Sequence, residues 1–254
     1  MKAGVLAIAA ALVSAAPASG ESLESFFPIL TRRPVIEYEV ELRTTHEKQR
    51  EARDTTASLA IEMPLLPRWG VSLSVPMVFS DPATAPSAAG IGDVELETKL
   101  VVYASGDRRA LVTAGLSLTL PTGSGDRRLG GALLVEPFAA LGFVVNDLLI
   151  VSDVGYIASF EGSPRDQRRI HGGLAIGRPV GRHLIPFLTL TAAGTLDSPT
   201  AHEEQRRRGL EVYLGPGLNV RILPRATLGL GVQVPVTRAR VQDYALFTTI
   251  DWDL

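Results

Sequence analysis

Hydrophobic residues alternate with polar or small residues along most of the chain. From Trp69 to Phe79 every second residue is apolar, and positions 70, 72, 74 and 76 of the other phase are Gly, Ser, Ser and Pro. The same alternation runs through 210–222 and 226–236. A period of two is that of a β-strand, whose side chains point alternately to its two faces. The pattern therefore predicts strands with one apolar face and one polar or small face.

This alternation predicts twelve strands, and no long helix is expected after residue 20. The strands are expected at 34–43, 55–65, 68–80, 91–103, 110–121, 132–145, 148–160, 169–179, 183–194, 209–222, 225–238 and 243–254. Three of them, at 132–145, 148–160 and 183–194, are apolar in both phases. For these three the pattern does not decide which face points where.

The connections between the predicted strands alternate in length. Short connections are expected at 66–67, 104–109, 146–147, 180–182 and 223–224, and longer, charged ones at 44–54, 81–90, 122–131, 161–168 and 195–208. Short turns at one rim and long loops at the other are typical of outer-membrane barrels. An even strand count puts both chain ends on the side of the short turns. We predict an all-β fold, a transmembrane up-and-down antiparallel β-barrel of about twelve strands. A soluble periplasmic β-protein, with the apolar face in its core, is the alternative.

Clusters of charge on the polar face favour the membrane barrel. One predicted strand carries Glu37, Glu39, Glu41 and Arg43 in a single phase, and another carries Asp93, Glu95, Glu97 and Lys99. Charged residues that face lipid near the bilayer centre cost about 2–4 kcal/mol for a basic residue and less for an acid. These side chains are therefore expected to face the lumen. Aromatic residues near the strand ends resemble interface belts, namely Trp69 and Trp252 at one rim and Phe79, Phe160 and Tyr244 at the other.

The N-terminal region and the composition agree with export. Residues 1–20 have the form of a signal peptide, with Lys2 before an apolar stretch and small residues at its end. The chain contains no Cys, which excludes a disulfide framework, a thiolate metal site and a lipid-modified Cys. A net charge of -2 excludes a basic nucleic-acid binder. The expected location is the bacterial outer membrane.

Two further segments have expected roles at the ends of the barrel. Residues 21–33 precede the barrel, which is expected to occupy 34–254, and include Phe26-Phe27-Pro28-Ile29-Leu30. This segment is either a plug in the lumen or a periplasmic tether, and the sequence leaves both open. The last strand alternates from Tyr244 to Leu254 and resembles the terminal strand that the barrel-assembly machinery recognises, although the usual last residue is aromatic.

Two short motifs resemble a known family. A Gly92-Asp93 pair opens a strand whose charged residues end in Lys99, and the next strand ends in Pro121-Thr122-Gly123. The chain resembles the outer-membrane β-barrel "transporter" family labelled as putative meta-pathway phenol-degradation proteins. The resemblance implies an exported barrel and uptake of small, often aromatic or hydrophobic compounds. It implies no catalytic residues.

The expected lumen is uneven in charge. The first and last strands are neighbours in a closed barrel, so Glu37, Glu39 and Glu41 are expected beside Asp251 and Asp253. The basic residues expected to face these acids are Arg43, Lys99, Arg178 and Arg221. Two interpretations follow, either an acidic constriction that selects cations or a set of ion pairs that fills and stiffens the barrel. Small residues in the inward phase, such as Gly215, Gly217, Gly229, Gly231, Ser72 and Ser74, are expected to leave a narrow passage.

The sequence therefore predicts a passive channel for small solutes, with outer-membrane lipid and lipopolysaccharide as surroundings. Arginines in the loops at 161–168 and 195–208 are candidates for contact with lipopolysaccharide phosphates, or simply for a solvated surface. An adhesive or structural barrel that works through its loops is one alternative. A lipid-modifying enzyme is another, but only His171 is expected inside a strand in the lumen phase, with no serine at a suggestive spacing. No metal, cofactor or nucleic acid is expected.

Overall fold

The computed structural model describes residues 23–28, 30–49, 51–124, 129–131, 133–160, 168–197 and 209–254. The expected signal peptide and most of the charged parts of the connections expected at 122–131, 161–168 and 195–208 lie outside the described residues. The described elements are η1(Leu23–Ser25), β1(Glu39–Gln49), β2(Ala52–Leu66), β3(Trp69–Pro82), β4(Ala88–Ile91), β5(Val94–Ala104), β6(Ala110–Leu120), β7(Leu133–Val145), β8(Leu148–Phe160), β9(Arg168–Gly177), β10(Leu184–Asp197), β11(Glu211–Leu223), β12(Ala226–Pro235) and β13(Gln242–Asp253). Among the described residues, no helix is long and apolar enough to cross a membrane.

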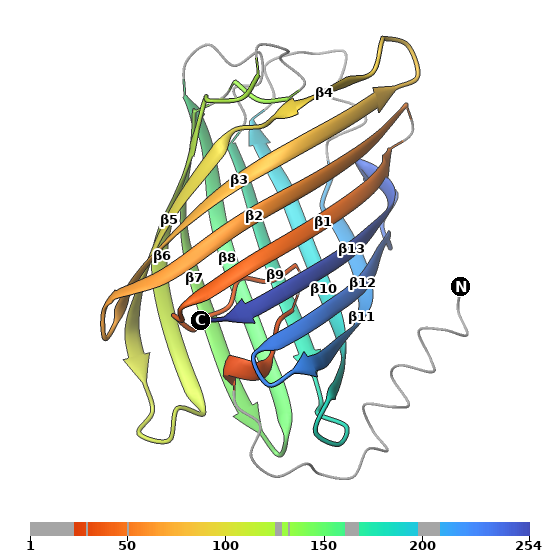
Figure 1. Cartoon of the computed structure of the whole chain (residues 1–254). Helices are drawn as coiled ribbons and strands as arrows, with labels where there is room; N and C mark the ends of the chain where they lie inside the picture. Colours follow the sequence, from red (N-terminus) through yellow and green to blue (C-terminus); the bar gives the residue numbers. More distant parts are fainter. Residues whose placement is uncertain are drawn as a thin grey trace.

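All of these strands except β4 form one closed antiparallel barrel (Figure 1). Each strand pairs with its neighbours in the chain, and β1 closes the barrel by pairing with β13, where Glu39 lies opposite Asp253. The predicted twelve-stranded fold is confirmed. The β7–β8 turn consists of Asn146 and Asp147, both with positive φ, which is the geometry that suits the twist of a tight hairpin.

Three predicted elements in the first part of the barrel differ from the structure, namely the first strand, the connection after it and the fourth strand. The first strand begins at Glu39 rather than at residue 34 and continues to Gln49, and β2 begins at Ala52. The expected long connection at 44–54 is therefore wrong, because both strands extend past the apolar region as a hairpin. The strand expected at 91–103 is interrupted at Gly92-Asp93, so that β4 and β5 pair with separate parts of β3.

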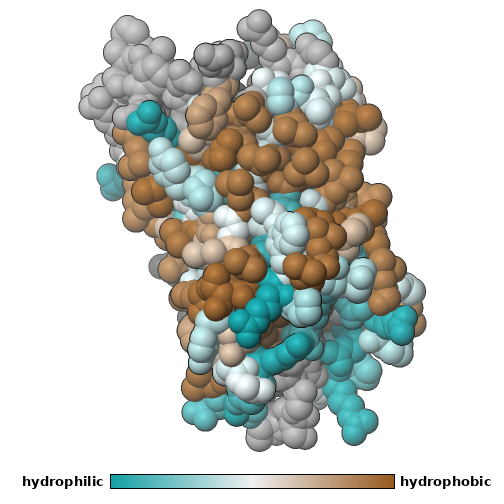
Figure 2. All heavy atoms as spheres, turned by 90° about the vertical axis from the view of Figure 1, so that its left-hand side faces the viewer, coloured by the Kyte–Doolittle hydropathy of each residue, from teal (hydrophilic) through white to brown (hydrophobic). Residues whose placement is uncertain are grey.

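The apolar phase of the strands points out of the barrel. On β3, Leu73, Val75, Met77 and Phe79 are between 40% and 47% exposed, whereas Ser80 in the other phase is buried. Figure 2 shows hydrophobic side chains over much of the outer wall on one side of the barrel. Exposed hydrophobic surface of this extent fits a surrounding of lipid chains.

The end of the lumen nearest the short turns is filled by the N-terminal segment, which we define as 23–38. This segment begins with η1 and continues inside the barrel to β1 (Figure 1). Leu23 and Phe26 are buried in one hydrophobic cluster with Leu149, Val151 and Phe187 from the barrel wall. The latter three belong to the strands that are apolar in both phases. These three inward side chains are apolar because they pack against this segment rather than against water.

Some of the small lumen residues make room for packed side chains instead of for a passage. A Cβ atom on Gly217 would lie 2.2 Å from the ring of Phe187, and one on Gly142 would lie 2.8 Å from Leu23. The expectation that inward glycines leave an open path is therefore wrong for Gly217. The inward serines Ser72 and Ser74, in contrast, line an open space in the lumen.

Candidate functional site: a charged cavity above the N-terminal segment

A cavity of about 520 Å³ lies in the lumen, bounded by the barrel wall and by the N-terminal segment. Its charged lining contains eight carboxylates, namely Glu39, Glu41, Glu62, Asp93, Glu95, Glu97, Asp153 and Asp251. It contains four strongly basic residues, namely Arg32, Arg33, Arg43 and Lys99, together with His171. The lining therefore carries an excess of negative charge, which favours cations in the cavity.

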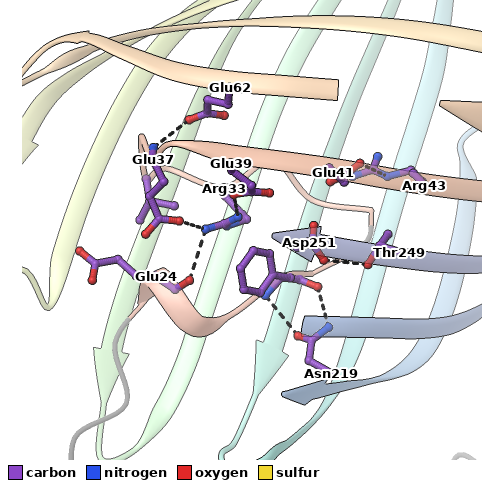
Figure 3. A network of polar contacts seen from close by, with 12 residues as sticks. Glu24, Arg33, Glu37, Glu39, Glu41, Arg43, Glu62, Asn219, Thr249 and Asp251 are labelled. Atoms are coloured by element: carbon purple, nitrogen blue, oxygen red, sulfur yellow. Dashed lines mark hydrogen bonds and ion pairs between the residues drawn. The ribbon is translucent and has the colours of Figure 1, made fainter. Parts of the chain in front are cut away.

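Closure of the barrel creates the densest group of acids. Because β1 pairs with β13, Glu41 lies opposite Asp251 and Glu39 lies opposite Asp253. Carboxylate oxygens of Glu39, Glu41 and Asp251 lie within 4.8 Å of one another. Arg43 contacts Glu41 at 2.9 Å within the same group (Figure 3). Carboxylates this close repel one another when they are charged, so nearby cations are needed to keep them charged.

Arg33 of the N-terminal segment supplies one of these partners. One terminal nitrogen donates to Glu39 Oε2 at 2.6 Å and the other donates to Glu37 (Figure 3). Its guanidinium also lies 3.9 Å from the centre of the Phe27 ring. Burial lowers the pKa of Arg33, but the carboxylates of Glu39 and Glu37 outweigh burial and hold the pKa above its ordinary value. Arg33 therefore stays charged and ties the segment to β1.

Arg32 ties the same segment to the opposite part of the wall. Its Nε donates to Glu97 Oε2 on β5 at 3.0 Å, and one terminal nitrogen donates to Glu136 on β7. The other terminal nitrogen lies 3.9 Å from Glu95 Oε1. Two consecutive arginines thus span the lumen between β1 and the β5–β7 wall.

Hydrogen bonds to its backbone secure the segment at three further points. The side-chain amide of Asn219 donates to the Phe27 carbonyl at 3.0 Å and accepts from the Phe27 amide at 3.2 Å (Figure 3). Thr113 donates to the Pro34 carbonyl at 2.6 Å. Lys99 donates to the Val35 carbonyl at 3.0 Å and pairs with Glu62 at 2.6 Å. The backbone of the segment is therefore recognised by the wall as specifically as its side chains are.

The residues of the two sequence motifs meet at the loop side of the barrel. Asp93 accepts hydrogen bonds from the Gly123 amide at 2.8 Å and from the Gly131 amide at 2.7 Å. The Thr122 hydroxyl accepts from the Val94 amide at 2.9 Å. Asp93 lines the cavity, but its carboxylate also holds the β6–β7 connection against the start of β5.

The structure brings together eight of the eleven residues predicted to line the lumen. Around the cavity lie Glu39, Glu41, Arg43, Asp93, Glu95, Glu97, Lys99 and Asp251. The other three lie outside this lining. Glu37 precedes β1, and Arg178 and Arg221 lie near the short-turn end of the barrel. Arg221 lines a smaller hollow together with Asn219.

Sequence reasoning missed five charged residues of the site, namely Arg32, Arg33, Glu62, Glu136 and Asp153. Glu62 shares the inward phase of its strand, so the alternation alone contained the signal for it. Glu136 and Asp153 lie on strands that are apolar in both phases. Arg32 and Arg33 precede the first strand, where no period exists to place them.

His171 does face the lumen, and its Nε2 lies 2.8 Å from Glu136 Oε1. Within the described residues, its hydrogen-bond partner is this carboxylate rather than a serine or another nucleophile. A carboxylate–histidine pair that lacks a nucleophile does not form the constellation required for acyl transfer.

Several solved structures have an architecture similar to that of this chain. The COG4313 outer membrane channel from Pseudomonas putida F1 matches with a TM-score of 0.71 and 13% identity over 90% of this chain and 100% of that one. The KdgM porin matches with a TM-score of 0.55 and 12% identity over 85% and 99%, and LpxR from Salmonella typhimurium with 0.54 and 8% over 85% and 100%. The chain has the fold of outer-membrane barrels. No family model and no curated protein matches it, so the resemblance to phenol-degradation transporters is not confirmed beyond the fold.

Proposed function

We propose that this protein is a bacterial outer-membrane channel for the passive passage of small solutes, with a preference for cations. The observation that carries the proposal is the lumen cavity, where eight carboxylates face four strongly basic residues. The similarity to a channel and a porin supports the same role. In this setting the loop side faces the exterior, where lipopolysaccharide surrounds the barrel, and the short turns face the periplasm.

The N-terminal segment sets the resting state of this channel. It fills the lumen between the cavity and the short-turn end through a hydrophobic cluster and is tied to the wall by Arg32 and Arg33. A solute that enters the cavity therefore meets a closed floor. Passage requires the segment to shift, so we expect brief or infrequent openings rather than a permanently open pore.

The charged lining also bears on the solute class. A cavity lined by eight carboxylates offers several acceptors to a polar cation. Uptake of aromatic compounds, which the family resemblance implies, stays a prediction. Glu95 is the carboxylate best placed to meet an entering solute, because its side chain is 40% exposed and lies 3.9 Å from its nearest cationic partner.

Single-channel recording of the refolded full chain in a planar bilayer tests the proposal. Under a salt gradient, the reversal potential is expected to show cation preference, and Glu95→Gln should reduce that preference. Asp107→Asn, at an exposed turn between β5 and β6, is the matched control and should leave it unchanged. A correctly folded, inserted protein that never conducts, or that prefers anions, would overturn the proposal.

A further inference from the structure

The guanidinium of Arg32 occupies a pocket that three carboxylates build from two strands. Its Nε faces Glu97, one terminal nitrogen faces Glu136, and the other faces Glu95. Each of the three nitrogens therefore has a different acid. The acids come from β5 and β7, which are parts of the barrel wall, whereas Arg32 belongs to the segment that fills the lumen.

An aromatic ring forms the floor of this pocket. The Cζ atom of Arg32 lies 4.2 Å from the centre of the Phe138 ring. The position of that ring depends on Gly115 of β6, since a Cβ atom there would lie 2.2 Å from the Phe138 ring. A planar cation stacks on such a ring while its edges donate to surrounding acceptors, and a guanidinium satisfies both demands better than a compact ammonium does.

The pocket opens into the lumen cavity. Arg32, Glu95 and Glu97 all line the cavity, and the side chain of Arg32 retains 21% of its exposure. A solute in the cavity can therefore reach Glu95 before it meets the guanidinium of the segment. The occupant is held by non-covalent contacts only, so another guanidinium can compete for the same acids.

The pocket also requires a cation. Without Arg32, Glu95 and Glu97 would lose their contacts with its guanidinium, and Glu136 would keep its contact with His171 at 2.8 Å. Lys99 is already paired with Glu62. Partly buried carboxylates that lose their partner destabilise a fold strongly. The vacated pocket is thus an acceptor for a replacement of the same shape and charge.

We infer that the pocket formed by Glu95, Glu97, Glu136 and Phe138 is a binding site for guanidinium-bearing solutes, with Arg32 as its tethered occupant. A solute that binds there displaces Arg32 and loosens the N-terminal segment. The inference deepens the proposed channel function by naming a substrate class, and the link between binding and passage rests on that function. Binding itself does not.

Arg32→Gly in the full chain tests the site, with guanidinium chloride as the probe at about 20 mM, far below the molar range that denatures proteins. The thermal unfolding midpoint in detergent is the readout. We expect the variant to unfold at a lower temperature than the wild type and guanidinium to restore much of the difference. Because the tethered competitor is gone, guanidinium should bind the variant about tenfold or more tightly than it binds the wild type.

Three controls make the result specific. Sodium chloride and tetramethylammonium chloride at the same concentration should not restore the midpoint, because they supply charge without a planar set of donors. Arg108→Gly, which removes an exposed pair with Glu24 at 3.1 Å, should show no response to guanidinium. Adding Phe138→Leu to the Arg32→Gly variant should abolish the response by removing the floor.

Two outcomes would overturn the inference, namely equal restoration by all three salts and no response to guanidinium. If Arg32→Gly does not fold, Arg32→Lys replaces it, because this variant keeps one positive charge. Guanidinium should still raise the unfolding midpoint of Arg32→Lys, since an ammonium cannot face all three acids. An unchanged midpoint would also overturn the inference. The unfolding midpoint needs no ion flow. A chain that binds guanidinium but never conducts would therefore contradict the proposed function and leave the site intact.

Discussion

Asp93 Oδ1 accepts a hydrogen bond from the backbone amide of Gly123 at 2.8 Å, which joins two motifs that lie 30 residues apart. The second oxygen of the same carboxylate accepts from Gly131 at 2.7 Å. One acid thus fixes both the break between β4 and β5 and the start of the β6–β7 connection. The glycines are needed nearby, because a Cβ atom on Gly130 would lie 2.3 Å from Asp93 Oδ1.

Asp93→Ala should destabilise the loop side of the barrel. The variant loses two hydrogen bonds to a charged acceptor, which we expect to cost about 2 kcal/mol in the free energy of unfolding. Urea unfolding of the folded barrel in lipid vesicles measures this cost. Thr122→Val, which removes the acceptor of one neutral hydrogen bond at 2.9 Å, should cost about half as much. An Asp93→Ala variant as stable as the wild type would show that the motif has no structural role.

Asn219→Leu should loosen the N-terminal segment. Asn219 is 1% exposed and makes both a donor and an acceptor bond to the Phe27 backbone. Leucine leaves both backbone groups unpaired in a buried setting, at an expected cost of about 2 kcal/mol. In planar bilayers, we expect the variant to spend a larger fraction of time open.

The matched control for that variant is Gln233→Leu. Gln233 is also buried, but its side-chain oxygen accepts from Gln242 at 2.7 Å within the barrel wall. This change should reduce stability without increasing the open fraction. Equal open fractions for the two variants would argue against the N-terminal segment as the closing element.

Gly217→Ala should be costly although alanine adds one carbon only. The new Cβ would lie 2.2 Å from the Phe187 ring, which packs edge-on against Phe26 with 5.8 Å between ring centres. Overpacking of this kind costs about 1–3 kcal/mol. Gly194→Ala is the control, because nothing lies within 4 Å of its Cβ position, and its effect should stay within about 0.5 kcal/mol. Urea unfolding midpoints compare the two.

Glu37→Gln should stabilise the protein near neutral pH despite the loss of an ion pair. Burial raises the pKa of Glu37, and Arg33 does not fully offset it because Glu39 and Asp253 lie close by. A carboxyl with a raised pKa in the folded state favours folding below its unfolded pKa, near 4.3, and loses this contribution as the pH rises through the folded pKa.

The corresponding measurement is the thermal unfolding midpoint of wild type and Glu37→Gln at about pH 4 and pH 7.5. We expect the variant to have the higher midpoint at pH 7.5 and the two proteins to converge at pH 4, where Glu37 is protonated. A variant that is less stable at pH 7.5 would show that the Arg33–Glu37 pair outweighs the burial of the carboxylate.

Most of the barrel wall could be predicted from the sequence, because strand periodicity is a local property. Side chains on a strand alternate between two faces, so the phase of Leu73 and Val75 already identifies the outward face without knowledge of any neighbour. The same phase placed Glu95, Glu97 and Lys99 in the lumen. The adjacency of the strands that carry Glu41 and Asp251 also followed, since a closed meander must pair its first strand with its last.

The contents of the lumen were decided only by tertiary structure. Arg32 reaches Glu97 and Glu136 across separations of 65 and 104 residues, and Phe27 reaches Asn219 across 192. No period links such positions, because the N-terminal segment has no regular repeat and its partners are chosen by shape and charge. The same packing explains why β8 and β10 could not be assigned a face, since their inward residues Leu149, Val151 and Phe187 are apolar to match a segment of the chain itself. Alternation determined the wall, and the long-range fit of one irregular segment determined what fills it.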